Sequence, residues 1–164
     1  MNRCIAFLRP YLDSPAKTMV FFDITVYVRP NSDFNAIEET LDGERLETLS
    51  VHSQSLNLPF PVSFEEASAA LQQLPRLFLE PDGSWVWVGV KADGSTWQVD
   101  GQLVDRQERL IYVNLRGECP EEQFDQLLQA FGWPTVELLF QLRRPAVLVA
   151  ENPFRHWARR IHHQ

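Results

Sequence analysis

The sequence predicts an α+β fold built on an antiparallel β-meander, and three observations favour it. Between residues 76 and 116, residues alternate with the period of two that is typical of strands. Asp-Gly-Ser interrupts the alternation at residues 82–84 and 93–95, and Asp and Gly tolerate the positive φ angles of tight hairpins. Outside this region, the segments 63–74 and 120–131 carry apolar residues at helical spacing.

An N-terminal strand over residues 19–29 extends the predicted sheet, because apolar side chains alternate with Asp23 and Thr25 along it. Pro30 ends this strand, since proline cannot continue a hydrogen-bonded ladder. We expect a short helix from 33 to 41 that closes near Gly43.

The segment 45–62 stays unassigned, because its leucines fit either a strand or a turn of helix. The first strong helix, over 63–74, then begins with a capping box, in which Ser63 precedes Glu66 by three residues. Pro75 stops this helix. The four strands of the meander follow it, at 77–80, 85–90, 97–104 and 110–115.

The second helix, over 120–131, starts with Pro120 and two acidic residues near the positive end of the helix dipole. Residues 135–142 stay ambiguous, and 146–150 is predicted to be a short buried strand. Asn152 is a candidate N-cap for a last helix that reaches residue 161.

The length of 164 residues and an apolar content of 45% predict a single domain over residues 1–164. The net charge of −7 is unevenly distributed: residues 1–142 carry 10 Lys/Arg against 21 Asp/Glu, a net −11, while residues 143–164 carry five Arg against one Glu, a net +4. An acidic body repels phosphates and anionic lipids, so nucleic acid and membrane binding are disfavoured.

The two cysteines, Cys4 and Cys119, form no metal-ligand spacing, and we expect no metal or other cofactor. The N-terminus lacks the apolar core and cleavage site of a signal peptide. The longest apolar-rich run, over 19–28, is about half the length that spans a bilayer. These features favour a cytoplasmic location.

Alternation along the meander predicts one face that mixes aromatic and polar side chains, which suits stacking and hydrogen bonding to a ligand or partner. The candidate site residues on this face, with Gln102 beside them, are Trp85, Trp87, Gln98, Asp100, Tyr112 and Asn114. The opposite face, with Val86, Val88, Val90 and Trp97, is predicted to be core. The alternative is that helices cover the mixed face and that its tryptophans are packing residues.

Catalytic residues are not assigned. His52 stands beside several serines without an acid at a recognisable spacing, and an ordinary loop histidine is the simpler interpretation. The sequence contains none of the glycine-rich, nucleophile-elbow or zinc-protease motifs of the large enzyme classes.

The C-terminal segment from 152 is amphipathic and basic, and its candidate partner-binding residues are Arg155, His156, Arg159 and Arg160. It could dock on the acidic body, contact a partner or a second copy, or bind nucleic acid or membrane. Docking on its own domain is the simplest of these interpretations.

The sequence therefore favours a non-catalytic interaction or binding domain that contacts a protein partner or forms a homo-oligomer. Two alternatives remain open. One is a small hydrolase with an acid or His-based site, and the other is a module that binds a small apolar or sugar-like ligand.

Overall fold

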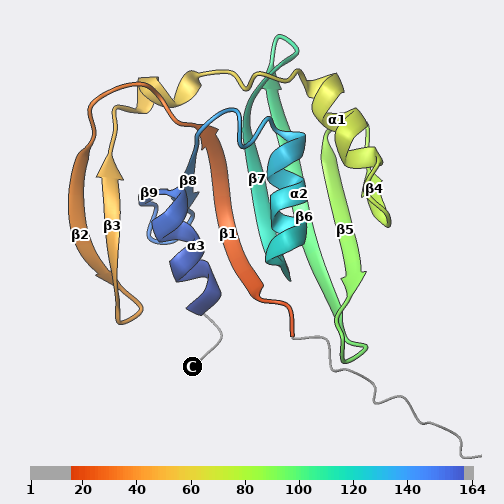
Figure 1. The fold of residues 1–164 in the computed structure, drawn as a ribbon. Helices are drawn as coiled ribbons and strands as arrows, with labels where there is room; N and C mark the ends of the chain where they lie inside the picture. The colour runs from red at the N-terminus through yellow and green to blue at the C-terminus, as the bar shows by residue number, and fades with distance from the viewer. Residues whose placement is uncertain (1–15, 161–164) are drawn as a thin grey trace, which may run out of the picture.

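A computed structural model of the chain describes residues 16–160, without the side chain of Arg160. Within these residues the chain forms a nine-stranded antiparallel sheet and three α-helices, which confirms the predicted α+β class (Figure 1). The spatial order of the strands is β2-β3-β9-β8-β1-β7-β6-β5-β4. The predicted meander forms one half of the sheet, as β4 to β7.

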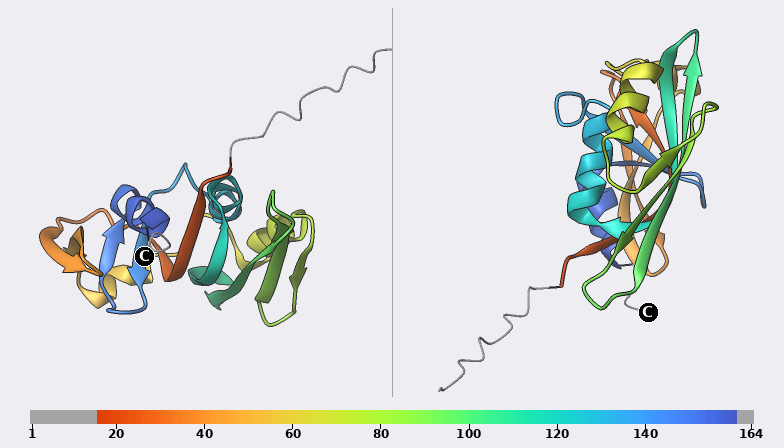
Figure 2. Two further views of the ribbon diagram at one scale, coloured as in Figure 1. Left: turned by 90° about the horizontal axis from the view of Figure 1, so that it is seen from below. Right: turned by 90° about the vertical axis from the view of Figure 1, so that its right-hand side faces the viewer.

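The strands are β1 Met19–Val28, β2 Asn35–Leu41, β3 Glu44–Ser50, β4 Leu77–Leu79, β5 Ser84–Val90, β6 Thr96–Arg106, β7 Arg109–Pro120, β8 Leu138–Leu142 and β9 Leu148–Ala150. The helices are η1 Ser53–Asn57, which is a 3₁₀ helix, and α1 Phe64–Gln72, α2 Glu121–Ala130 and α3 Glu151–Arg160. The helices α1, α2 and α3 lie on one side of the sheet (Figure 2). None of the helices in residues 16–160 has the length and apolar character needed to cross a membrane.

The strand β1 lies at the centre of the sheet, between β7 and β8. Val20, Ile24 and Val26 are fully buried in it. The N-terminal strand therefore joins the meander to the part of the chain that follows α2, and so ties the two halves of the sheet together.

The capping box predicted for α1 is present, since Ser63 Oγ accepts a hydrogen bond from Glu66 N at 3.1 Å and Glu66 Oε2 accepts one from Ser63 N at 2.8 Å. Three of the four predicted helices, over 63–74, 120–131 and 152–161, are confirmed within one or two residues at the ends that the structure describes. Residue 161, where the last helix was expected to end, lies outside the described residues.

The helix predicted over 33–41 is wrong, because this segment is the strand β2. Asp42 and Gly43 form the tight turn of a β2–β3 hairpin, and both have positive φ angles, of 51° and 81°. A hairpin turn of this kind favours strands on both sides of it. The unassigned segments 45–62 and 135–142 contain β3, η1 and β8.

The main core lies between the sheet and the three α-helices. We call the other side of β4, β5, β6, β7 and β1 the open face, because no helix in the described residues covers it. On the same side of β3, β8 and β9, a smaller cluster of Leu49, Leu139 and Leu148 is buried beneath Phe34 and Leu56. The open face is therefore about half of one side of the sheet.

Candidate functional site

The tryptophans of the predicted site are buried in the core. Trp85 and Trp87 are only 4% and 2% exposed, and they lie on the helix-covered side together with Trp97. The cross-strand register explains this placement, because Trp87 pairs with Val99, which is fully buried. The prediction that Trp85 and Trp87 share a face with Asp100 is therefore wrong, and neither ring can contact a partner in the folded chain.

The polar residues of the predicted site do come together, on the open face. Gln98 and Asp100 lie on β6, and Gln98 Nε2 donates a hydrogen bond to Asp100 Oδ1 at 2.9 Å. On β7, Asn114 Oδ1 accepts a hydrogen bond from Thr25 Oγ1 at 2.8 Å, and the Tyr112 ring lies 5.8 Å from that of Tyr27. These side chains form a continuous polar surface across three strands.

The residue Tyr27 shows how closely this surface is packed. Its hydroxyl donates a hydrogen bond to Gln141 Oε1 at 3.3 Å. Burial, and to a smaller extent the neighbouring Tyr112, raises the pKa of Tyr27 above its usual value. The phenol therefore stays protonated at neutral pH and acts as a hydrogen-bond donor.

Charged side chains of the open face form pairs across the strands. Lys91 Nζ lies 2.7 Å from Glu118 Oε1, and Arg143 Nη1 lies 3.6 Å from Asp23 Oδ1. Asp100 is directly opposite Arg116 in the β6–β7 ladder. These charges balance, in contrast to the chain as a whole with its net charge of −7.

An apolar stripe follows the outer strands of the open face. Phe78 on β4 is 64% exposed and Val90 on β5 is 53% exposed, with the half-buried Val86 and Val88 between them. We call Phe78, Val86, Val88 and Val90 the open-face stripe. The three valines were predicted to be core, and this prediction is wrong for the same reason as that for the tryptophans, because β5 presents its other side to the helices.

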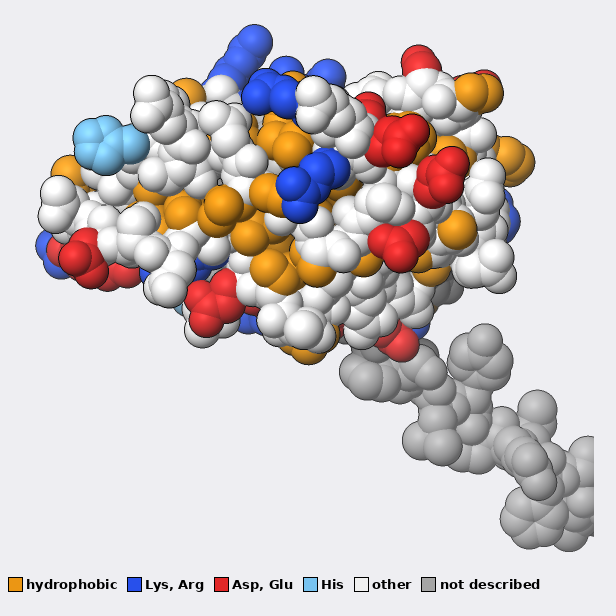
Figure 3. Space-filling model, turned by 90° about the horizontal axis from the view of Figure 1, so that it is seen from above, with side chains coloured by type: hydrophobic (Ala, Val, Ile, Leu, Met, Phe, Trp, Pro, Cys, Tyr) orange, Lys and Arg blue, Asp and Glu red, His pale blue; other side chains and the backbone are white. Residues whose placement is uncertain are grey.

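A second group of apolar side chains lies at one end of the sheet. Figure 3 shows hydrophobic side chains gathered across this end of the molecule, with acidic side chains to one side of them. Leu58, in the segment between η1 and α1, is 41% exposed, and Pro61 packs near Gly132 and Val136. This group faces a different direction from the open-face stripe.

A cavity of about 590 Å³ lies where the β5–β6 turn, the start of β1 and the start of α2 meet. Most of its lining is apolar, with Met19, Val90, Trp97 and Pro120 among the lining residues. Its volume is within the range of about 300–1,000 Å³ that is usual for ligand pockets. The cavity adjoins the open-face stripe, because Val90 belongs to both.

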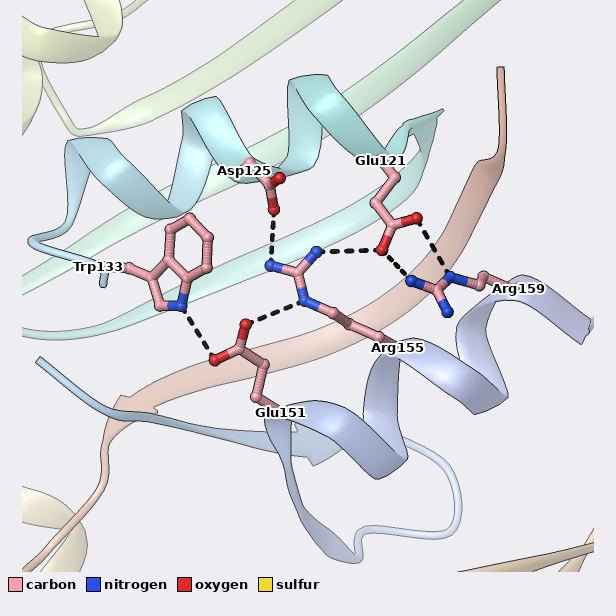
Figure 4. A network of polar contacts seen from close by, with 6 residues as sticks. All are labelled: Glu121, Asp125, Trp133, Glu151, Arg155 and Arg159. Carbon is pink, nitrogen blue, oxygen red and sulfur yellow. Dashed lines mark hydrogen bonds and ion pairs between the residues drawn. The ribbon is translucent and has the colours of Figure 1, made fainter. Parts of the chain in front are cut away.

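The basic C-terminal helix docks on its own chain (Figure 4). Arg155 is only 9% exposed, and its guanidinium points between α2 and α3, where it lies 2.6 Å from Asp125 Oδ1, 3.0 Å from Glu151 Oε1 and 3.3 Å from Glu121 Oε1. Arg159 also pairs with Glu121. The expectation that Arg155 binds a partner is therefore wrong, because its charge is already compensated within the chain.

The ion pairs of this network shift the pKa values of their members. Burial alone raises the pKa of Glu121, but the hydrogen bonds and charges of Arg159 and Arg155 outweigh it, so the pKa is below its usual value. Burial lowers the pKa of Arg155, but Asp125 and Glu151 outweigh that effect and raise it. Trp133 completes the network by donating a hydrogen bond from Nε1 to Glu151 Oε2 at 2.9 Å.

His52 and His156 do not join these surfaces. His52 precedes η1 at its N-terminal end and is exposed, and its side chain makes no capping hydrogen bond. His156 is exposed on α3, and the side chain of Arg160 lies outside the described part of the chain. Among residues 16–160, no three His, Cys, Asp or Glu side chains are grouped so that they could hold a metal ion.

Comparison with models of known families, with curated proteins and with solved structures found no match to this chain. The open face, its apolar stripe and the adjoining cavity are therefore interpreted from their own geometry. The sequence did contain a signal for the open-face stripe. Gly89 and Gly101 lie opposite Trp97 and Trp85 and leave room for these rings on the helix-covered side, so the valines of β5 must lie on the other side.

Proposed function

We propose that this chain is a non-catalytic interaction domain that binds a protein partner through its open face. The observation that carries the proposal is the open-face stripe. Large apolar side chains at 64% and 53% exposure, on neighbouring strands and in line with two further valines, form a contiguous apolar surface. Contiguous exposed apolar surface of this kind is typical of interaction sites.

The polar surface beside the stripe supports the same interpretation. Protein interfaces combine an apolar centre with a rim that makes hydrogen bonds, and depletion of unbalanced charge is typical of the centre. The open face offers this combination, with Gln98, Asp100, Tyr112 and Asn114 next to the stripe and with its charged side chains in pairs.

The antiparallel sheet could instead simply be solvated on one side, as many are. Photo-crosslinking separates the two interpretations. We would place the photoreactive residue p-benzoylphenylalanine at position 78, and in matched variants at Leu58 and at the exposed Gln129 of α2. On irradiation in the cells that produce the chain, we expect a discrete covalent adduct at position 78, absent at 58 and 129.

The mass of that adduct distinguishes a second copy of the chain from a different protein. A second substitution tests the surface itself, because Val88→Asp adds a charge to the middle of the stripe and should abolish the adduct at position 78. A solvated face would give no adduct at position 78, or the same weak products at all three positions, and either result contradicts the proposal.

A further inference from the structure

The cavity beside the β5–β6 turn extends between the sheet and the helix α2. Trp97 lines it from the helix-covered side of β6, and Gln123 lines it from the first turn of α2. Met19 and Pro120, at the start of β1 and the end of β7, complete this part of the lining. The space therefore belongs to the side of the sheet that is opposite to the open face.

The size of the cavity suits a small organic molecule. An apolar cavity of about 150 Å³ already holds benzene, and this cavity, of about 590 Å³, is several times larger. Ala16 and Ala92 line it and are exposed, so the cavity can be reached from solvent. A molecule of two or three rings can therefore enter and fit.

The charged side chains that line the cavity, among the described residues, all have partners. Lys17 Nζ lies 3.0 Å from Glu122 Oε2, and Lys91 Nζ lies 2.7 Å from Glu118 Oε1. Asp93 accepts hydrogen bonds within the β5–β6 turn. No charge of the lining is thus left to balance that of a ligand, and a neutral molecule suits the cavity better than an ion.

One polar atom of the lining residues lacks a partner. Gln123 Oε1 is buried and accepts no hydrogen bond within the described part of the chain. A buried acceptor without a donor destabilises the fold. The last torsion of a glutamine side chain is broad, so the amide can turn its oxygen toward the cavity. A donor group on a bound molecule would then pair with it.

We propose that the cavity binds a small, neutral and largely apolar molecule that carries one hydrogen-bond donor, and that this donor pairs with Gln123 Oε1. A ring system fits best, because the ring of Trp97 and the thioether of Met19 both make favourable contacts with aromatic rings. This site is separate from the open face and does not depend on the function proposed for that face.

The first test uses the full chain and two fluorescent probes of the same skeleton. N-phenyl-1-naphthylamine is neutral, has three aromatic rings and carries one N–H donor, while 1-anilinonaphthalene-8-sulfonate adds a sulfonate. We expect a saturable rise in fluorescence with one neutral probe per chain. The sulfonate should bind at least about tenfold more weakly, because an unpaired charge in an apolar cavity is costly.

The position of the probe is tested with a matched pair of variants. Ala92→Trp places a large side chain at the cavity and should weaken binding of the neutral probe at least about fivefold, as expected for overpacking. Ala36→Trp is the control, because Ala36 is exposed on β2 at the far end of the sheet, and it should bind as the wild type does. NMR shifts of the Trp97 indole N–H and the Gln123 side-chain amide should saturate together with the fluorescence.

The hydrogen bond to Gln123 is tested by removing the donor from the probe. N-methyl-N-phenyl-1-naphthylamine should bind the wild type about two- to tenfold more weakly than the unmethylated probe, the loss expected for one hydrogen bond. In Gln123→Leu the two probes should bind equally. The shift of the Gln123 side-chain amide in the wild type decides the same point if Gln123→Leu fails to fold.

Several results would overturn the proposal. They are the absence of saturable binding of the neutral probe, equal affinities for the neutral probe and the sulfonate, and equal binding by Ala92→Trp and Ala36→Trp. Shifts confined to Phe78 and Val88 would place the probe on the open face instead. A preference for the N–H probe that persists in Gln123→Leu would contradict the role of Gln123.

Discussion

The indole ring of Trp85 lies across Gly101 of the neighbouring strand, so closely that a Cβ atom at Gly101 would be 2.0 Å from the ring. Trp97 has the same relation to Gly89 on β5. The two glycines leave the space in which the rings lie between the sheet and the helices. This arrangement fixes which side of β5 is buried, and therefore which side carries the open-face stripe.

The variant Gly101→Ala should destabilise the fold, because the added methyl group displaces the Trp85 ring. We expect a loss of about 1–3 kcal/mol in the free energy of unfolding, the usual cost of overpacking a core. Urea unfolding followed by tryptophan fluorescence measures it. The control Gln98→Ala, on the open face of the same strand, should stay within about 0.5 kcal/mol of the wild type. Equal stability of Gly101→Ala and the control would contradict the close packing of this ring.

The same pair of residues shows why the predicted site was only partly correct. Alternation assigns residues of one strand to two faces, but it does not relate the faces of neighbouring strands. In β5 both sides are apolar, with tryptophans on one and valines on the other, so hydrophobicity could not decide between them. The tryptophan side of β5 is the buried one, because Gly89 and Gly101 leave the space that the Trp97 and Trp85 rings occupy beneath the helices. For β6 and β7, where polar residues mark one side, the predicted residues Gln98, Asp100, Tyr112 and Asn114 do share the open face.

The fold was predicted best where local signals were strong. The capping box at Ser63, the Pro120 start of α2 and the alternation of β1 each identify an element from neighbouring residues. The β2–β3 hairpin was missed, although Asp42-Gly43 is a turn signal, because its exposed strand β2 lacks alternating hydrophobicity. The central position of β1 depends on contacts far apart in sequence, which local patterns do not contain.

Removal of the buried guanidinium by Arg155→Met should be costly. Three carboxylates, of Glu121, Asp125 and Glu151, would lose their shared counter-charge. Breaking a buried ion pair by removing one partner costs about 3–5 kcal/mol. Arg159→Met is the matched control, because the Arg159 side chain is 43% exposed and an exposed pair contributes about 0–1 kcal/mol. Chemical denaturation of both variants tests the difference, and similar losses would show that Arg155 is not the centre of the network.

Acidification should weaken the contact between α2 and α3. The pKa of Glu121 is lowered in the folded chain, so its contribution to stability is present above the usual value of 4.5 and is lost as the pH falls through the folded value. Asp82 and Asp93 also have lowered pKa values, because they accept hydrogen bonds from Ser84 and Ser95 in their turns. Protonation of each of these three carboxylates therefore lowers the free energy of unfolding as the pH falls.

The contribution of Glu121 is isolated by comparing variants over the acid range. The free energy of unfolding of Glu121→Gln should depend less steeply on pH below about 4.5 than that of the wild type, because one titrating group with a shifted pKa is absent. The control Asp82→Asn removes a turn carboxylate instead. In this variant, the contribution of Glu121 to the pH dependence of the free energy of unfolding should remain. A Glu121→Gln variant with the wild-type slope would rule out the network as a source of acid sensitivity.

The thiol of Cys119 should be inert in the folded chain. Cys119 is fully buried, and burial first, then the charges of Glu118 and Asp125, raise its pKa far above the usual value of 9.0. Since the thiolate is the reactive form, iodoacetamide should modify Cys119 only when the chain unfolds. The experiment uses a Cys4→Ser chain, so that Cys119 is the sole thiol, and its labelling rate should rise steeply with urea through the unfolding transition.

The raised pKa of Cys119 also predicts sensitivity to alkali. A thiol whose folded pKa is raised contributes stability below its unfolded pKa, and this contribution is lost as the pH rises above that value toward the folded one. The Cys4→Ser chain should therefore lose stability above about pH 9, and adding Cys119→Ala should remove the part of that loss due to the thiol. Rapid labelling of the folded Cys4→Ser chain at neutral pH would contradict both expectations, because it would require a thiolate that the packing between β7 and α2 excludes.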